Sequence, residues 1–442
     1  MQVKPGIVEG MPEVYATYDV VAYDKDGNII TLADKYYGNF PAINKDVYFN
    51  WTKDSYIRNT GLKIKYQTYS SIENFDPNKR YFYFIPLAIW TNDFHNWFMF
   101  MEKEKVKRLA DNNVGIIFAY DNEHLPSFDV GYFLKSFEWF VNLLNNNGDN
   151  RLKFYFLSVS NLMDDFKTYM SHFVSPNIKF IYSPLMFASV RNTIPREKDN
   201  VNIKLNLNLC SQVLKDYCNS PKNKQFLNLN NMQRYHRDMF INGLRAFNLL
   251  DQGYVSRNME CGNNYPVSDI YKSEYADKIR QDRLSPLPIM RLDATDQSHS
   301  TELGYHQFAV QYMKDSCYDI VSETGVMYEL GDAVDMSILS EKTAKSLAFG
   351  RPFMINGGPN CMKKIKKLGF QTFEWLFDES YDSNLNLFDR QELLIKNILR
   401  YKDNIENLWK IIIDHKDILE YNQNKFFNFD FERYIVGELF NE

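Results

Sequence analysis

The sequence lacks the long apolar segments of a membrane protein and the cysteine patterns of a secreted or zinc-binding one. No apolar run approaches the roughly 18 residues that a transmembrane helix needs, and residues 1–6 contain no apolar signal region. The five cysteines are odd in number and form no Cys-x-x-Cys pair, which argues for reduced thiols and against a zinc site. We therefore expect a soluble protein of the cytoplasm with no membrane partner.

Histidine-based metal sites and phosphate-binding loops are also missing. The seven histidines include no i,i+4 pair accompanied by a ligand acid. His299, Glu302 and His306 share a helical face, but a solvated helix surface explains that spacing more simply. Gly357-Gly358 is not followed by Lys-Ser or Lys-Thr, which excludes a Walker loop. We expect no metal ion and no other cofactor.

Neither sign of charge dominates the chain. The formal net charge is −5, so any face that binds duplex DNA must be a local basic patch. Aromatic residues reach 16%. An AT-rich coding sequence explains this level most simply, and the alternative is a surface that stacks on sugar or base rings. The length of 442 residues predicts two or three domains.

Buried strands and helices alternate in two parts of the chain. Continuous apolar runs predict strands with both faces buried at 81–87, 114–120, 153–159 and 178–182. Helical segments separate them, so we expect a parallel sheet with helices on both faces. The alternation resumes with expected strands at 226–229, 317–321 and 352–355 and expected helices at 235–250 and from Glu341 onward.

The expected fold class is α/β, with two Rossmann-like domains. Polar, turn-rich residues 191–224 predict the passage between the domains. We place the first domain at 1–222, on the acceptor side, and the second, nucleotide-binding domain at 223–388. Residues 389–420 predict one or two long amphipathic helices. We expect residues 389–442 to close the fold by packing across both domains.

The most informative stretch is 339–359. Ser340 is a natural helix N-cap, and Glu341 lies in the first turn, where the helix dipole favours a carboxylate. Lys342 and the free backbone N–H groups of a helix start suit a diphosphate, and an adjacent acid can accept hydrogen bonds from ribose hydroxyls. The simpler alternative is a capped helix start that binds no ligand.

Two families resemble this chain. Ser340-Glu341-Lys342, followed by Gly350-Arg351-Pro352-Phe353, resembles the donor-site signature of GT-B glycosyltransferases, especially the α-1,3-fucosyltransferase family. Residues 368–373 and 378–382 resemble bacteriophage glycosyltransferase-like proteins. The strand and basic turn at 226–230, Arg234, His236 and Arg237 resemble the start of the second domain in that group. The matches lie within residues 224–385, and the first 220 residues contain no matching motif.

The resemblance implies a metal-independent glycosyltransferase in the GT-B arrangement, with a UDP- or GDP-linked sugar as donor. It implies that Glu341 contacts the ribose and Lys342 the diphosphate. Arg234 and Arg237 follow an expected strand, where they can neutralise the departing diphosphate, although a solvated helix start is the alternative. The other expected donor-binding residues are Ser340, Thr343, Glu323 and Gly357.

A sugar acceptor that carries a hydroxyl needs a base to take its proton. Asp121, Glu123 and His124 directly follow the expected strand 114–120, and Glu123 is the preferred candidate. Asp93 and His95 follow another expected strand and stay open as alternatives. The metal-dependent alternative is disfavoured because the spaced acids at 293–296 and 332–335 do not match the acidic pair of GT-A enzymes.

The acceptor side is marked by basic and aromatic residues that interleave between residues 45 and 66. Trp51, Lys53 and Arg58, together with His95, form the expected acceptor-binding set, which suits phosphate contacts and stacking on an unpaired or flipped base. The alternative is ordinary surface lysines and core aromatics. Because phages glycosylate hydroxymethylated pyrimidines, the phage resemblance implies a hydroxymethylated cytosine in phage DNA, in an infected host cell. A glycan or polysaccharide acceptor and a non-catalytic binding protein for nucleotide sugars or nucleic acid remain alternatives.

Overall fold

A computed structural model gives the fold. It describes residues 15–17, 21–23, 29–31, 65–67, 81–87, 110–111, 115–120, 153–158, 178–184, 187, 190, 207–230, 234–257, 272–282, 290, 310–323, 338–384 and 386–440. The chain divides into two compact units. The first contains 1–159, 163–185 and 430–442, and the second contains 160–162 and 186–429. The three-part division expected from the sequence stays a prediction.

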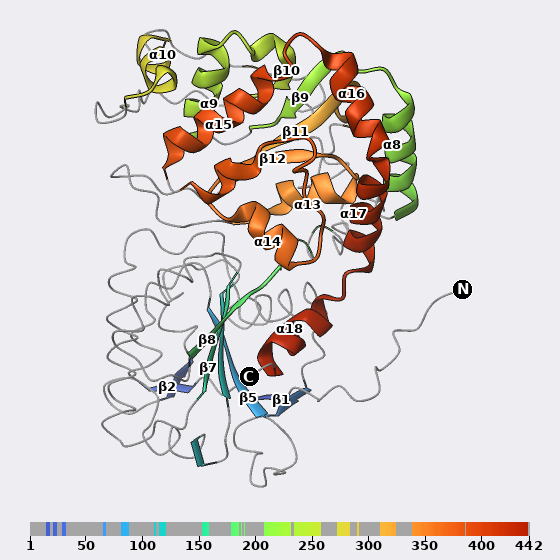
Figure 1. Ribbon diagram of the computed structural model, residues 1–442. Coiled ribbons are helices and arrows are strands. Elements are labelled where there is room, and N and C mark those ends of the chain that lie inside the picture. Colours follow the sequence, from blue (N-terminus) through green and yellow to red (C-terminus); the bar gives the residue numbers. More distant parts are fainter. Residues whose placement is uncertain are drawn as a thin grey trace. The chain divides into compact units, whose positions relative to one another are not determined.

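The first unit is built on a six-stranded parallel sheet in the order β4-β1-β5-β6-β7-β8. Its four longer strands confirm the strands expected from the apolar runs at 81–87, 114–120, 153–159 and 178–182. The sheet strands are β1 (Tyr15–Thr17), β4 (Lys65–Gln67), β5 (Tyr81–Leu87), β6 (Gly115–Tyr120), β7 (Phe154–Ser158) and β8 (Ile178–Tyr182). Figure 1 shows β7 and β8 side by side.

Two further elements belong to this unit. A short antiparallel pair is formed by β2 (Val21–Tyr23) and β3 (Ile29–Thr31). The last helix of the chain, α18 (Phe431–Phe440), returns to the first unit, where it contacts β8. Phe431 and Ile435 of α18 are buried.

The second unit contains a four-stranded parallel sheet in the order β10-β9-β11-β12. Its strands are β9 (Lys224–Asn228), β10 (Gly253–Val255), β11 (Ser316–Ser322) and β12 (Phe353–Asn356). All seven residues of β11 and all four of β12 are buried, so this sheet forms the core of the unit. The expected strands at 226–229, 317–321 and 352–355 are confirmed, with ends shifted by a few residues.

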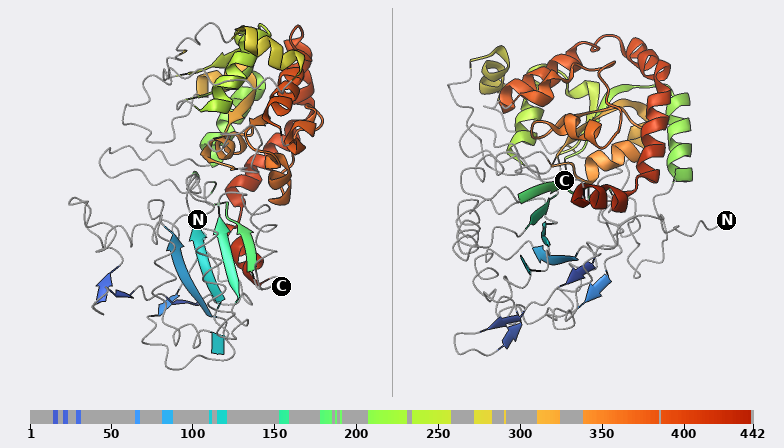
Figure 2. Two further views of the ribbon diagram at one scale, coloured as in Figure 1. Left: turned by 90° about the vertical axis from the view of Figure 1, so that its left-hand side faces the viewer. Right: turned by 60° about the horizontal axis from the view of Figure 1, so that its bottom comes forward.

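Helices flank this sheet in two groups (Figures 1 and 2). One group contains α9 (Tyr235–Ala246), α10 (Glu274–Asp282) and α15 (Leu387–Leu399), which contact one another. In the other, α17 (Lys416–Asn428) contacts both α8 (Leu207–Asn219) and α13 (Glu341–Ala348), and α12 (Val310–Asp315) contacts α8. The remaining helices are α14 (Cys361–Lys367), α16 (Ile405–Asp414), and the 3-10 turns η3 (Leu250–Gln252) and η5 (Glu379–Ser383).

The helices of the second unit add to one expectation and correct another. Residues 207–219 of the polar segment 191–224 form α8, which buries Cys210, Leu214 and Tyr217, and the place of the passage between domains stays a prediction. The C-terminal region was expected to form one or two long helices, but three follow one another as α15, α16 and α17. The side chain of Asn404 accepts a hydrogen bond from Asn407 N–H, which starts α16 as a separate helix.

The strand order of the second unit reverses between β9 and β11. From β9 the chain crosses through α9 to β10 on one side, and β11 is followed by β12 on the other. Ligands of open α/β sheets bind where the carboxyl ends of the strands meet such a reversal. Here those ends carry Asn228, Ser256, Glu323 and Gly357. This edge is therefore where a ligand site is expected.

Candidate functional site

The first turn of α13 forms one side of the candidate site. Ser340 is the N-cap, and its Oγ accepts hydrogen bonds from Lys342 N–H at 3.2 Å and from Lys342 Nζ at 3.3 Å. Lys342 Nζ also lies 2.8 Å from Glu341 Oε1. The side chains of Lys342 and Glu341 are 26% and 25% exposed. An acid and a lysine therefore meet at the protein surface in the first turn of a helix.

The charge balance of this turn favours an anionic ligand. Burial alone would raise the pKa of Glu341, but the ammonium groups of Lys342 and Lys345 outweigh it and lower the pKa to about 2. Burial lowers the pKa of Lys345, and the carboxylate of Glu341 opposes that shift. When all three groups are ionised, two positive charges face one negative charge. The helix dipole adds further positive potential at the same place.

Glu323 links this turn to the end of β11. Its side chain is fully buried, and its Oε1 accepts hydrogen bonds from Ser340 N–H at 3.0 Å and from the hydroxyl of Thr343. Its backbone N–H donates to Asn356 O at 3.1 Å, which ties it to β12. Three of the expected donor-site residues therefore meet directly, with Glu323 at their centre.

The start of α9 meets the same residue from the other side. Arg237 Nη2 donates to Glu323 O at 2.9 Å and to Ser322 O at 3.2 Å. His236 Nε2 lies 2.9 Å from Glu323 O, and burial holds the pKa of His236 well below its ordinary value. The ring is therefore neutral, and Nε2 carries the hydrogen because its partner is a carbonyl. Arg237 is buried, so the alternative of a solvated helix start is wrong for it.

Arg234 and Arg257 lie at the same edge of the sheet. Arg234 is the N-cap residue of α9 and is half-buried, and its Nε has no hydrogen-bond partner among the described residues. Arg257 follows β10 and forms a buried, two-pronged pair with Asp238, at 3.1 and 3.2 Å. Arg257 was not among the expected site residues, because the strand that precedes it was not expected from the sequence.

A buried polar network runs behind these groups. Asn228 Nδ2 donates to Ser322 Oγ at 3.0 Å, and Asn356 Nδ2 lies 3.4 Å from the same oxygen. Gln391 Nε2 donates to Asn356 Oδ1 at 3.0 Å, and Tyr275 OH donates to Gln391 Oε1 at 3.0 Å. Such a network holds strand ends rigidly when its members are satisfied. The network was not expected from the sequence, although Asn228, Ser322 and Asn356 each end an apolar strand.

The glycine-rich loop after β12 serves packing. A Cβ on Gly357 would lie 3.1 Å from both Glu323 Cβ and Ile355 Cγ2, so a glycine lets the loop approach Glu323 closely. The helix that follows, α14, does not offer its start to a ligand. The Asp382 carboxylate already accepts the N–H groups of Met362 and Lys363, at 2.9 and 3.1 Å.

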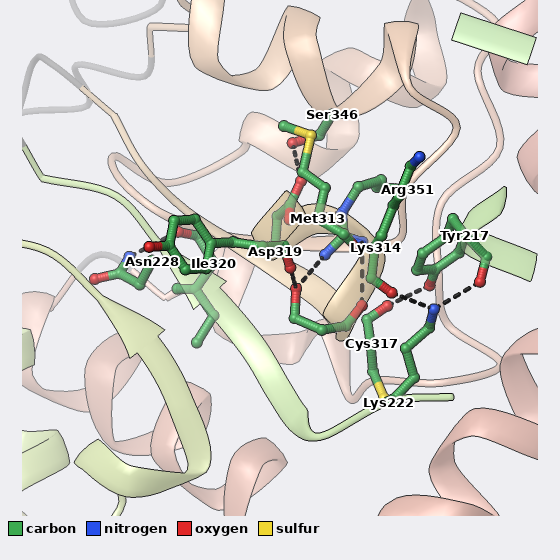
Figure 3. Close-up of polar contacts among 12 residues, drawn as sticks. Tyr217, Lys222, Asn228, Met313, Lys314, Cys317, Asp319, Ile320, Ser346 and Arg351 are labelled. Atoms are coloured by element: carbon green, nitrogen blue, oxygen red, sulfur yellow. Dashed lines mark hydrogen bonds and ion pairs between the residues drawn. The ribbon is translucent and has the colours of Figure 1, made fainter. Parts of the chain in front are cut away.

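The second half of the signature lies at the opposite end of the sheet (Figure 3). Arg351 precedes β12 and is buried, with its Nε 2.8 Å from Asp319 Oδ1. Its other nitrogens donate to Met313 O and to Ser316 O and Oγ. Ser316 is the first residue of β11, so this cluster lies away from the carboxyl ends of the strands. Gly350 has a φ of 63° and ends α13 in the left-handed conformation. These residues shape the fold and do not line the site.

The remaining expected site residues lie outside the described residues. They are the catalytic candidates Asp121, Glu123 and His124 and the acceptor-binding candidates Trp51, Lys53, Arg58 and His95. Within the part of the chain that the structure describes, no group of three or more His, Cys, Asp and Glu side chains is placed to hold a metal ion. No helix in that part is long and apolar enough to cross a membrane.

Comparisons with known proteins give one distant likeness. No protein-family model matches the chain, and no curated protein matches it. Among solved structures, it is similar to a mutant of T4 phage BGT in complex with UDP-glucose, at 10% sequence identity and a TM-score of 0.31. The similarity covers 98% of this chain and 100% of that one. At this identity and score the likeness assigns no function by itself. The α/β class with parallel sheets follows from the strand pairing of the chain itself.

Proposed function

We propose that the protein is a glycosyltransferase that moves a sugar from a nucleotide-sugar donor to a hydroxyl acceptor. The observation that carries this proposal is the Glu341–Lys342 pair at the start of α13, beside the strand reversal of a parallel sheet. A surface acid next to a lysine at a helix start matches the two polar parts of a nucleoside diphosphate, which are the ribose hydroxyls and the diphosphate.

Each residue has a distinct role in this proposal. Lys342 binds the diphosphate, and Glu341 accepts hydrogen bonds from the ribose. Arg234, at the start of α9, adds a second positive group. Because negative charge grows on the diphosphate as the sugar departs, these fixed cations stabilise the transition state more than the bound donor. The arrangement requires no metal ion for this step.

For the acceptor we propose a hydroxymethylated cytosine of phage DNA, on the strength of the family resemblance. In this reading the two units form a GT-B arrangement, and Glu123, with Asp121 and His124 as alternatives, removes the acceptor proton. Trp51, Lys53, Arg58 and His95 hold the acceptor strand. These assignments rest on the sequence pattern alone.

The test is mass spectrometry of nucleosides. DNA that contains hydroxymethylcytosine is incubated with the protein and a panel of UDP- and GDP-sugars, and then digested. A mass gain of one sugar on that nucleoside is the expected result. No gain with any donor, together with stabilisation of the protein by one nucleotide sugar, would reject the DNA acceptor and point to a glycan. No gain and no binding of any nucleotide sugar would reject the proposed function.

A further inference from the structure

Glu323 occupies the junction between four elements of the second unit. It follows β11 directly, and its backbone N–H is bonded to the end of β12. Its backbone carbonyl accepts hydrogen bonds from Arg237 and His236 of α9. Its carboxylate accepts hydrogen bonds from Ser340 and Thr343 at the start of α13. Glu323 therefore connects the starts of the two helices that flank the strand reversal.

Burial of the Glu323 carboxylate costs free energy of hydration, and its hydrogen bonds must compensate for this loss. A fully buried carboxylate loses its hydration and is stable only when hydrogen bonds replace it. One oxygen, Oε1, accepts both bonds from α13, and Oε2 has no hydrogen-bond partner among the described residues. The interaction of Glu323 with α13 is thus concentrated on Ser340 and Thr343, which are themselves fully buried.

The bonds from Glu323 fix the backbone that carries the Glu341–Lys342 pair. Ser340 N–H and the Thr343 hydroxyl flank that pair on either side in the sequence. Ser340 in turn fixes the backbone of the next residues, because its Oγ accepts a hydrogen bond from Lys342 N–H and its carbonyl accepts one from Ala344 N–H at 3.2 Å. Gly357 leaves room for this arrangement, since a Cβ there would press on Glu323.

We propose that Glu323 is a positioning residue that holds the first turn of α13 in the conformation that binds the nucleotide diphosphate. This inference rests on the proposed function for its ligand, but its structural part does not. Glu323 acts through Ser340 and Thr343 and does not touch the ligand in this proposal. Its carboxylate oxygen accepts the two hydrogen bonds that order the helix start, and a residue without an acceptor at this position leaves that turn less ordered.

The test compares Glu323→Ala, Thr343→Val and Thr343→Ser in the full chain by amide hydrogen exchange. Thr343→Val keeps the shape and removes the hydroxyl, and Thr343→Ser restores the hydroxyl. We expect exchange at Ser340, Lys342 and Ala344 to rise about 10- to 100-fold in the first two variants, the range for a hydrogen bond to a charged group. Amides of β11, which contacts α13 but does not depend on this bond, serve as the internal control. Thr343→Ser should exchange nearly as the unsubstituted protein does.

The affinities of UDP and GDP for the folded variants complete the test. We expect Glu323→Ala and Thr343→Val to weaken binding of the preferred nucleotide about tenfold or more, with recovery in Thr343→Ser. Equal acceleration at all amides, or none at the helix start, would overturn the proposal. So would local acceleration with unchanged affinity. If neither nucleotide binds the unsubstituted protein, the proposed function fails, while the exchange pattern still decides whether Glu323 orders the helix start.

Discussion

Lys342 Nζ lies 2.8 Å from Glu341 Oε1, although the two residues are adjacent in the chain. Neighbouring residues within a helix do not normally face each other, and this pair forms in the first turn of α13. A nucleoside diphosphate that enters this turn replaces one ion pair with two interactions, phosphate on the lysine and ribose on the acid. The pair is therefore both the positive group and the acceptor that the proposed donor needs.

Loss of Lys342 should weaken nucleotide binding directly. We expect Lys342→Met to raise the dissociation constant of the preferred nucleoside diphosphate about 10- to 100-fold, because a hydrogen bond to a charged phosphate is removed. Titration calorimetry measures this change. Lys410→Met, at an exposed position of α16, is the matched control and should bind normally. Equal affinities of the two variants would contradict the assignment of Lys342.

The acidity of Glu341 should depend on its lysine neighbour. Its pKa of about 2 results from Lys342 and Lys345 acting against burial. Because this pKa lies below the ordinary 4.5, Glu341 contributes stability above pH 4.5 that is lost as the pH falls toward 2. In Lys342→Met we expect a higher pKa, so the contribution of Glu341 to stability becomes smaller and its loss is complete at a higher pH. A carbon-13 NMR titration of the carboxyl group measures the pKa, and an unchanged pKa would contradict the pairing.

Arg351 should matter for stability and not for binding. It forms a buried pair with Asp319, and removing one partner of such a pair leaves the other charge buried without a partner. We expect Arg351→Met to lower the free energy of unfolding by about 3 kcal/mol or more. The folded fraction should bind nucleotides as before. Weakened binding without loss of stability, in denaturation and calorimetry, would place Arg351 in the site after all.

Lys222 should make stability rise with pH above neutrality. It is buried between the rings of Tyr217 and Trp409, at 4.3 and 4.1 Å from their centres (Figure 3 shows Tyr217 and Lys222). Burial, and then the guanidinium of Arg351, lower its pKa from 10.5 to about 7. Between these values the unfolded chain binds more protons, so the free energy of unfolding increases with pH.

The slope that Lys222 contributes should reach up to about 1.4 kcal/mol per pH unit. Urea denaturation at several pH values between 7 and 10.5 measures it, and Lys222→Met should lose this part of the slope. Lys410→Met is again the control and should keep it. A Lys222→Met profile parallel to that of the unsubstituted protein would show that Lys222 titrates normally.

The sequence predicted what local chemistry and periodicity determine. Strands buried on both faces were visible as apolar runs, and the start of α13 was visible because Ser340 caps it through its own side chain. The placement of Glu341 and Lys342 followed from the same cap. These features need only neighbours in the chain, so no tertiary information was required to find them.

The sequence did not reveal roles that depend on distant partners. In the sequence, Arg351 resembles part of a donor signature. In the structure it pairs with Asp319, 32 residues away, at the far end of the sheet. Glu323 was one polar residue after a strand, and its importance appears only with Ser340 and Thr343. Likewise α8 lies in a polar segment, and its apolar side is recognisable only against α17.

The central claim is that a nucleotide sugar binds at the first turn of α13. The most direct test is hydrogen exchange of the unsubstituted full chain, with and without each UDP- and GDP-sugar of a panel. The account predicts that one donor slows exchange at Ser340, Lys342 and Ala344, whose amides lie in or next to that turn. A donor that binds by calorimetry but leaves these three amides unchanged, or a panel in which no donor binds, would contradict it.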